Sequence, residues 1–194
     1  MFGIPRSLLV ALVLALGSPG FASEIGVVRV DFELVNQEGG REPWYEIAVV
    51  VSVEEGESDP DANPRFADDV TVSVALAAEV NRGRGRGYEF YANRMEYPAL
   101  EVGQHAVRFF LPPEIVKRDR VRGEPFAYEI EVFSAEGLEF SLVSNNLDNP
   151  AALQSFHSQL AASKSDSSVL LPQYQTPFAW AYPRDTPTAR QPSR

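Results

Sequence analysis

Apolar and polar residues alternate repeatedly between positions 28 and 142, and this pattern limits the chain to a few folds. A period of two indicates β-strands with one buried face and one solvated face. In the first run, Val28, Val30, Phe32 and Leu34 alternate with polar residues, and six further runs follow. Their apolar positions are Tyr45/Ile47/Val49/Val51/Val53, Val70/Val72/Val74/Leu76, Tyr88/Phe90/Ala92, His105/Val107/Phe109/Leu111, Phe126/Tyr128/Ile130/Val132 and Leu138/Phe140/Leu142.

The spacing of these runs predicts an all-β fold. Glycine- or proline-containing turns separate the runs, and no proline interrupts one, as strands that donate to a ladder require. About seven short antiparallel strands over residues 24–148 predict an immunoglobulin-like β-sandwich, with a closed barrel as the alternative. In the fourth run the alternation changes phase before Met95 and Tyr97, which predicts a bulge or bend there.

Two segments outside the alternating runs have other patterns. Residues 112–122 form a charged connector with at most a turn of helix. Asn149 followed by Pro150 is a typical helix start, and apolar residues at helical spacing predict a short amphipathic helix over 149–163. The Pro/Ser-rich tail, residues 164–194, contains an aromatic island and is expected to be extended.

The N-terminus has the features of a secretory signal peptide. A short basic start precedes the nine apolar residues Leu8–Leu16, and Gly20 and Ala22 are small residues at a cleavage site. Nine residues are too few for a membrane span, which needs roughly 20. Residues 1–23 are therefore expected to be removed, leaving an extracytoplasmic chain (periplasm or cell surface) without a membrane span.

Charge and composition exclude several classes of function. The net charge is −10, which disfavours nucleic acid as a partner because that affinity comes from cationic side chains. The chain has no Cys and two His, so thiol chemistry is excluded and triad chemistry has little material. His105 and His157 are both expected to pack at the edges of apolar faces. We expect no catalytic residue, no cofactor and no metal site, and hence no enzyme.

An acidic loop over residues 54–69 leaves one metal alternative open. Asp59, Asp61 and Asn63 fit the first ligand positions of a calcium loop, but Pro64 and Val70 break the pattern. A solvated loop is the favoured interpretation, and a calcium site of another kind stays open.

Two features are candidates for partner binding. Arg82, Arg84 and Arg86, each followed by Gly, could bind a partner's carboxylates, although a hairpin tip is the simpler interpretation. The tail aromatics should cover a surface, either this domain's own sheet or another subunit; they are Tyr174, Phe178, Trp180 and Tyr182. Trp44 and Tyr91 would belong to a carbohydrate platform if the sandwich bound sugars.

Several short motifs resemble a known family. They are DFEL at 31–34, the F-A-x-x-V-x-V pattern from Phe66 to Val72, FLPP at 110–113 and TPFA at 176–179. Together with the layout, they resemble a verrucomicrobial family of pilus-like proteins whose genes accompany type IV pilus assembly genes. The resemblance implies a non-enzymatic, exported immunoglobulin-fold protein whose partners are other proteins of a pilus or envelope assembly. The alternative function is a carbohydrate-binding β-sandwich module.

Overall fold

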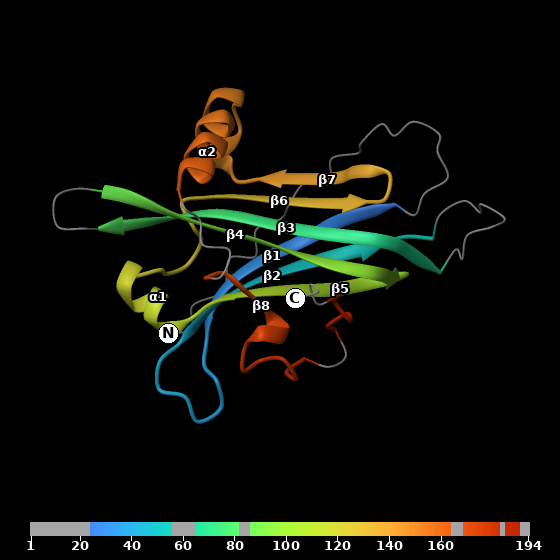
Figure 1. The fold of residues 1–194 in the computed structure, drawn as a ribbon, viewed down its shortest axis with the longest axis horizontal. Coiled ribbons are helices and arrows are strands. Elements are labelled where there is room, and N and C mark those ends of the chain that lie inside the picture. The colour runs from blue at the N-terminus through green and yellow to red at the C-terminus, as the bar shows by residue number, and fades with distance from the viewer. Residues whose placement is uncertain (1–23, 56–64, 82–85, 164–168, 183–184, 191–194) are drawn as a thin grey trace, which may run out of the picture.

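Two antiparallel four-stranded sheets packed face to face make up the computed structural model (Figure 1). It describes residues 24–55, 65–81, 86–163, 169–182 and 185–190. The first sheet has the order β1-β2-β5-β8 and the second the order β4-β3-β6-β7. The strands are β1 (Ile25–Val35), β2 (Trp44–Val53), β3 (Phe66–Asn81), β4 (Arg86–Glu101), β5 (Gly103–Leu111), β6 (Ala127–Ser134), β7 (Gly137–Val143) and β8 (Leu171–Pro172).

The sandwich is immunoglobulin-like with one change of strand partner. In constant-type immunoglobulin domains the fourth strand lies beside the fifth. Here β4 pairs with β3 instead, and this leaves the outer edge of β5 open to the C-terminal β8. No ladder among the described residues joins the two sheets, so the sandwich is confirmed and the barrel is not.

The core between the sheets is built by the alternation that the sequence predicts. Twelve inward residues of β2, β3 and β5 are at most 2% exposed, because each strand keeps one register with its neighbour. They are Tyr45, Ile47, Val49, Val51, Val53, Val70, Val72, Val74, Leu76, Val107, Phe109 and Leu111.

In β1 the prediction is wrong at Val28. The register against β2 shifts between Val27 and Arg29, so Val28 is the extra residue of a β-bulge and is 44% exposed. Ile25 and Val27 are buried before the bulge, and Val30 and Phe32 pack against the core after it. The prediction is also wrong at Leu34, which is 45% exposed at the end of the strand. The bulge changes which residues face the core, and a run of apolar residues does not reveal it.

In β4 the expected bulge is absent. Its register with β3 is the same from Glu101 to Arg86. Tyr91, Met95 and Tyr97 face the main core, whereas Phe90 and Ala92 face the opposite side and pack beneath a helix. The apparent change of phase arises because the two ends of one regular strand bury opposite faces.

The helix predicted over 149–163 is present, and the charged connector contains a helix of seven residues, longer than the single turn expected. α1 (Pro113–Asp119) connects the two sheets, and α2 (Pro150–Ala162) follows a 3-10 turn, η1 (Asn145–Leu147). The Asn149 side chain caps α2 by accepting from the Ala152 N–H at 2.8 Å. The second core lies beneath α2, where Phe156 packs on Ala75, Ala77 and Ala127 of the second sheet. Among the described residues, no helix is long and apolar enough to cross a membrane.

Candidate interaction surface at the C-terminal tail

The open edge of β5 is the place where the tail joins the sandwich. Leu171 and Pro172 pair with Phe110 and Phe109, and the Leu170 side chain is completely buried in the main core. The Leu170 carbonyl accepts a hydrogen bond from the Asn93 side chain at 2.5 Å. The tail thus contributes a strand to the first sheet and a residue to the main core.

Beyond β8, a buried glutamine organises the chain. Gln173 opens the 3-10 turn η2 (Gln173–Gln175) and is 2% exposed. Its Nε2 donates to the carbonyls of Phe178 at 3.1 Å and Ala181 at 2.9 Å. Its Oε1 accepts from the Thr186 hydroxyl at 3.3 Å. One side chain therefore satisfies three polar groups and holds Phe178, Ala181 and Thr186 close to Gln173.

Thr176 fixes the middle of the same segment. Its hydroxyl donates to the Gln173 carbonyl at 2.7 Å and accepts from the Phe178 N–H at 3.1 Å. The backbone of residues 176–181 turns twice, through Ala179 N–H to Thr176 and Ala181 N–H to Phe178. We call residues 173–182 the tail turn.

Phe178 anchors the tail turn on the outer face of the first sheet. Its ring stacks on Phe110 with centroids 4.7 Å apart and planes 8° from parallel. Trp44 meets it edge-on at 5.8 Å. Phe178 is 6% exposed, so it covers this domain's own sheet.

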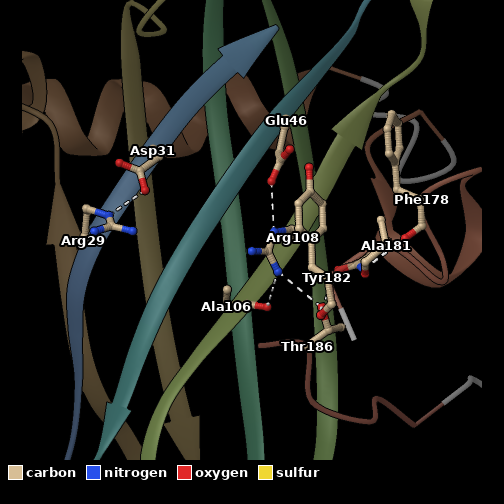
Figure 2. A network of polar contacts seen from close by, with 10 residues as sticks. Arg29, Asp31, Glu46, Ala106, Arg108, Phe178, Ala181, Tyr182 and Thr186 are labelled. Atoms are coloured by element: carbon tan, nitrogen blue, oxygen red, sulfur yellow. Dashed lines mark hydrogen bonds and ion pairs between the residues drawn. The ribbon is translucent and has the colours of Figure 1, made fainter. Parts of the chain in front are cut away.

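Tyr182 covers a buried ion pair (Figure 2). Arg108 Nε lies 3.0 Å from Glu46 Oε1, and both side chains are about 10% exposed. The guanidinium also donates to the Thr186 hydroxyl at 3.2 Å and lies 4.2 Å from the centre of the Tyr182 ring. Burial raises the pKa of the Glu46 carboxyl, although Arg108 counteracts part of the shift.

Trp180 is the exception among the tail aromatics. It is 93% exposed, although it lies between two residues that pack on the sheet. A tryptophan can bury about 150–250 Å² of surface, and it is one of the residues most enriched at interface hot spots. Its exposure leaves that surface open to another molecule.

The other predicted binding residues are placed as follows. Tyr174 is half-buried against the main core. The backbone of Arg86 pairs with Asn81 where β4 begins. Four other predicted features lie outside the described residues: Arg82 and Arg84, the Arg86 side chain, the signal segment 1–23 and most of the acidic loop. Partner binding by these residues therefore stays a prediction.

A polar groove runs along the outer face of the first sheet beside Tyr182. It has a volume of about 380 Å³, and six charged side chains belong to its lining. Among them are the Arg29–Asp31 ion pair, at 2.6 Å, and the Glu46–Arg108 pair (Figure 2). Glu33 and Asp185 add two more carboxylates, so the groove has acidic character.

An apolar pocket lies where β1, the β1–β2 connection and α1 meet. Its volume is about 590 Å³. Leu34, Pro43, Pro113, Val116 and Val121 supply the apolar walls. Lys117, Arg120 and Arg122 provide positive charge, and Glu42 provides one carboxylate.

The histidines and the sugar-platform aromatics occupy structural positions. His105 Nε2 lies 2.5 Å from the Glu101 carbonyl oxygen, and His157 Nε2 lies 2.7 Å from a Glu129 carboxylate oxygen. Tyr91 is 4% exposed and donates to the buried Asp119, which also accepts from Arg118. Burial, followed by the bond to Asp119, raises the pKa of the Tyr91 hydroxyl. Neither Tyr91 nor Trp44, which packs on Phe178, offers a flat exposed ring.

Comparison with known proteins shows the fold and no family. No family model matches the chain, and no curated protein matches it. A crystal structure from Akkermansia muciniphila has a similar fold, with a TM-score of 0.69 at 18% identity. The match covers 91% of this chain and 98% of that chain. The similarity extends over nearly the whole of both chains, including the sandwich.

Sequence reasoning missed Gln173, Arg108 and Glu46. A buried glutamine in a Ser/Pro-rich tail has no distinguishing signal. Arg108 and Glu46 occupy the outward positions of β5 and β2, where charged residues are expected to be solvated. Only the return of the tail across that face explains why both are buried.

Proposed function

We propose that this chain is a non-enzymatic, exported structural or interaction protein that works in a type IV pilus-like or cell-surface assembly. The observation that carries the proposal is the tail turn. Gln173 holds the turn together, Phe178 fixes it to the sandwich, and Trp180 is presented almost completely to solvent. Such a fixed, exposed anchor is what a protein–protein contact needs.

Three further observations support this proposal. The N-terminal sequence has the composition of a secretory signal. The sandwich agrees with the fold expected from the resemblance to verrucomicrobial pilus-like proteins, and the structurally similar protein comes from a verrucomicrobial bacterium. Among the described residues, neither histidine ring hydrogen-bonds a hydroxyl nucleophile.

Cell fractionation tests the proposal. We expect the protein in the envelope fraction or in the fraction sheared from the cell surface, together with the other assembly components. Trp180→Ala should reduce its retention there several-fold, whereas Leu138→Ala, which removes another exposed apolar side chain, should not. Recovery of the protein in the cytoplasm would overturn the proposal.

A carbohydrate-binding module is the second candidate, supported by the polar groove. Its paired arginines and carboxylates, with Tyr182 at one side, could hydrogen-bond and stack on a sugar. Titration with oligosaccharides, followed by NMR shifts of Arg108 and Tyr182, tests this candidate. Shifts confined to the groove would support it, and no shift with any glycan would exclude it.

A further inference from the structure

The backbone at Trp180 is held in place, although the side chain itself is 93% exposed. Phe178, two residues earlier, is stacked on Phe110, and Tyr182, two residues later, lies over Arg108. The tail turn between them is closed by the two hydrogen bonds from Gln173. Because the backbone of the tail turn is already ordered, burying the indole against a partner costs the tail turn little backbone entropy.

The apolar pocket has the chemistry to receive an indole. Pockets of about 300–1,000 Å³ hold drug-sized ligands, so its volume of about 590 Å³ has room for this smaller ring system. Pro43 and Pro113 offer flat apolar walls, and Leu34 at the end of β1 is 45% exposed. The cations of Arg120 and Arg122 can lie over an aromatic face.

The charges around the two features are complementary. The groove that Tyr182 lines contains four carboxylates and two guanidinium groups: Asp31, Glu33, Glu46 and Asp185 against Arg29 and Arg108. The apolar pocket has the opposite balance, with Lys117, Arg120 and Arg122 against Glu42. A second copy that brings its tail turn to this pocket therefore meets opposite charge, which favours association.

From these observations we infer that Trp180 of one molecule inserts into the apolar pocket of a second copy of this chain. The inference rests on the proposed function and names one partner, the protein itself. The two surfaces are different patches of the same molecule (Figure 1 shows α1 at one end of the sandwich and the tail beside β5). Each copy can thus give its Trp180 to one neighbour and receive another's, which builds a chain of molecules unless the contacts close into a pair or ring.

Fluorescence provides the first test, because the chain has only two tryptophans. In a Trp44→Phe background, Trp180 is the sole indole, and Phe preserves a ring against Phe178. We expect its emission to shift to shorter wavelength as the concentration of purified protein rises, with association in sedimentation over the same range. Adding Leu34→Glu, which places a carboxylate among the pocket's cations, should abolish the shift. Adding Leu138→Ala should leave it unchanged.

A mixing experiment provides the second test. Trp180→Ala keeps the pocket and Leu34→Glu keeps the tryptophan, so each variant alone should sediment as a monomer. Mixed in equal amounts, they should form a one-to-one heterodimer through the single intact contact. The heterodimer also excludes misfolding as the reason that either variant is monomeric alone.

Two results would overturn the inference. The first is wild-type protein that stays monomeric, with unshifted Trp180 emission, at all concentrations. The second is an equal mixture that shows no heterodimer. The proposed function can still hold after either result. It holds if the protein still fractionates with the envelope and Trp180→Ala still reduces its retention there, because the partner is then a different protein.

Discussion

At the residue scale, the charged groups that matter most are those that the fold removes from water. Glu129 and Glu131 lie on the outer face of β6. Glu129 is buried, and its carboxylate contacts His157 of α2. Burial raises the pKa of the Glu131 carboxyl, and the nearby Glu129 raises it further, whereas His157 lowers it. The ionised form of Glu131 is therefore less favourable in the folded state than in the unfolded chain.

This shift predicts a pH-dependent effect of Glu131→Gln. Because the folded-state pKa is raised, the folded protein binds the proton more tightly, and stability falls as pH rises from the unfolded value through the raised value. Glutamine cannot ionise, so the stability of the variant relative to wild type should increase over that window. Urea unfolding at a series of pH values measures it. A relative stability that is constant or falls with pH would contradict the assignment.

The buried Asp119 gives a second prediction at this scale. Asp119→Ala removes the acceptor of the Tyr91 hydroxyl and of Arg118, and should cost about 1–3 kcal/mol because the buried hydroxyl loses its partner. Tyr91→Phe leaves Asp119 bound to Arg118 and should cost less, about 0.5–1.5 kcal/mol. Chemical denaturation of both variants measures the difference. The reverse order would show that Arg118 does not compensate for the loss of the tyrosine.

At the scale of the elements, the strands show why periodicity predicts an element better than it predicts its faces. In β1, one extra residue at Val28 shifts the pattern, and in β4 a regular strand resembles a shifted one because α2 buries its outer face. In both strands the local sequence shows where the apolar residues are, and this is enough to predict a strand. Which face is covered depends on elements distant in the chain.

The β1 bulge predicts a contrast between two adjacent valines. Val27→Ala removes a buried side chain and should destabilise the protein by roughly 0.5–3 kcal/mol. Val28→Ala removes an exposed one and should stay within about 0.5 kcal/mol of wild type. Midpoints of urea unfolding at equal m-value measure both. A larger loss at Val28 would place the bulge elsewhere in β1.

At the scale of the whole molecule, the tail closes one side of the sandwich. It pairs with β5 at β8, and the Asp185 carbonyl accepts from the Ala106 N–H at 2.8 Å. The Arg190 N–H then donates to the Glu96 carbonyl of β4 at 2.7 Å. The last described residues therefore contact the part of β5 that β8 leaves unpaired and the edge strand β4 of the other sheet. Exposed strand edges are sites of unwanted pairing.

Removal of residues 164–194 should therefore reduce stability as well as partner binding. Loss of the fully buried Leu170 alone should cost roughly 2–5 kcal/mol, as for other large core truncations. The uncovered β5 edge should also promote aggregation, which light scattering detects. Removal of residues 183–194 only, which keeps Leu170 and β8, should cost less. Equal stability of the full chain and the longer truncation would contradict the structural role of the tail.

The architecture follows from local sequence patterns: the alternating runs predict the strands, and the Asn149–Pro150 pair predicts the start of α2. These features depend on residues close together in the chain, so their patterns can be read locally. Three outcomes depend on the packed fold: β4 pairs with β3, the free edge of β5 receives β8, and Phe178 is buried while Trp180 is exposed. Those outcomes depend on contacts between segments far apart in the chain, such as Phe178 with Phe110, and no local pattern encodes them.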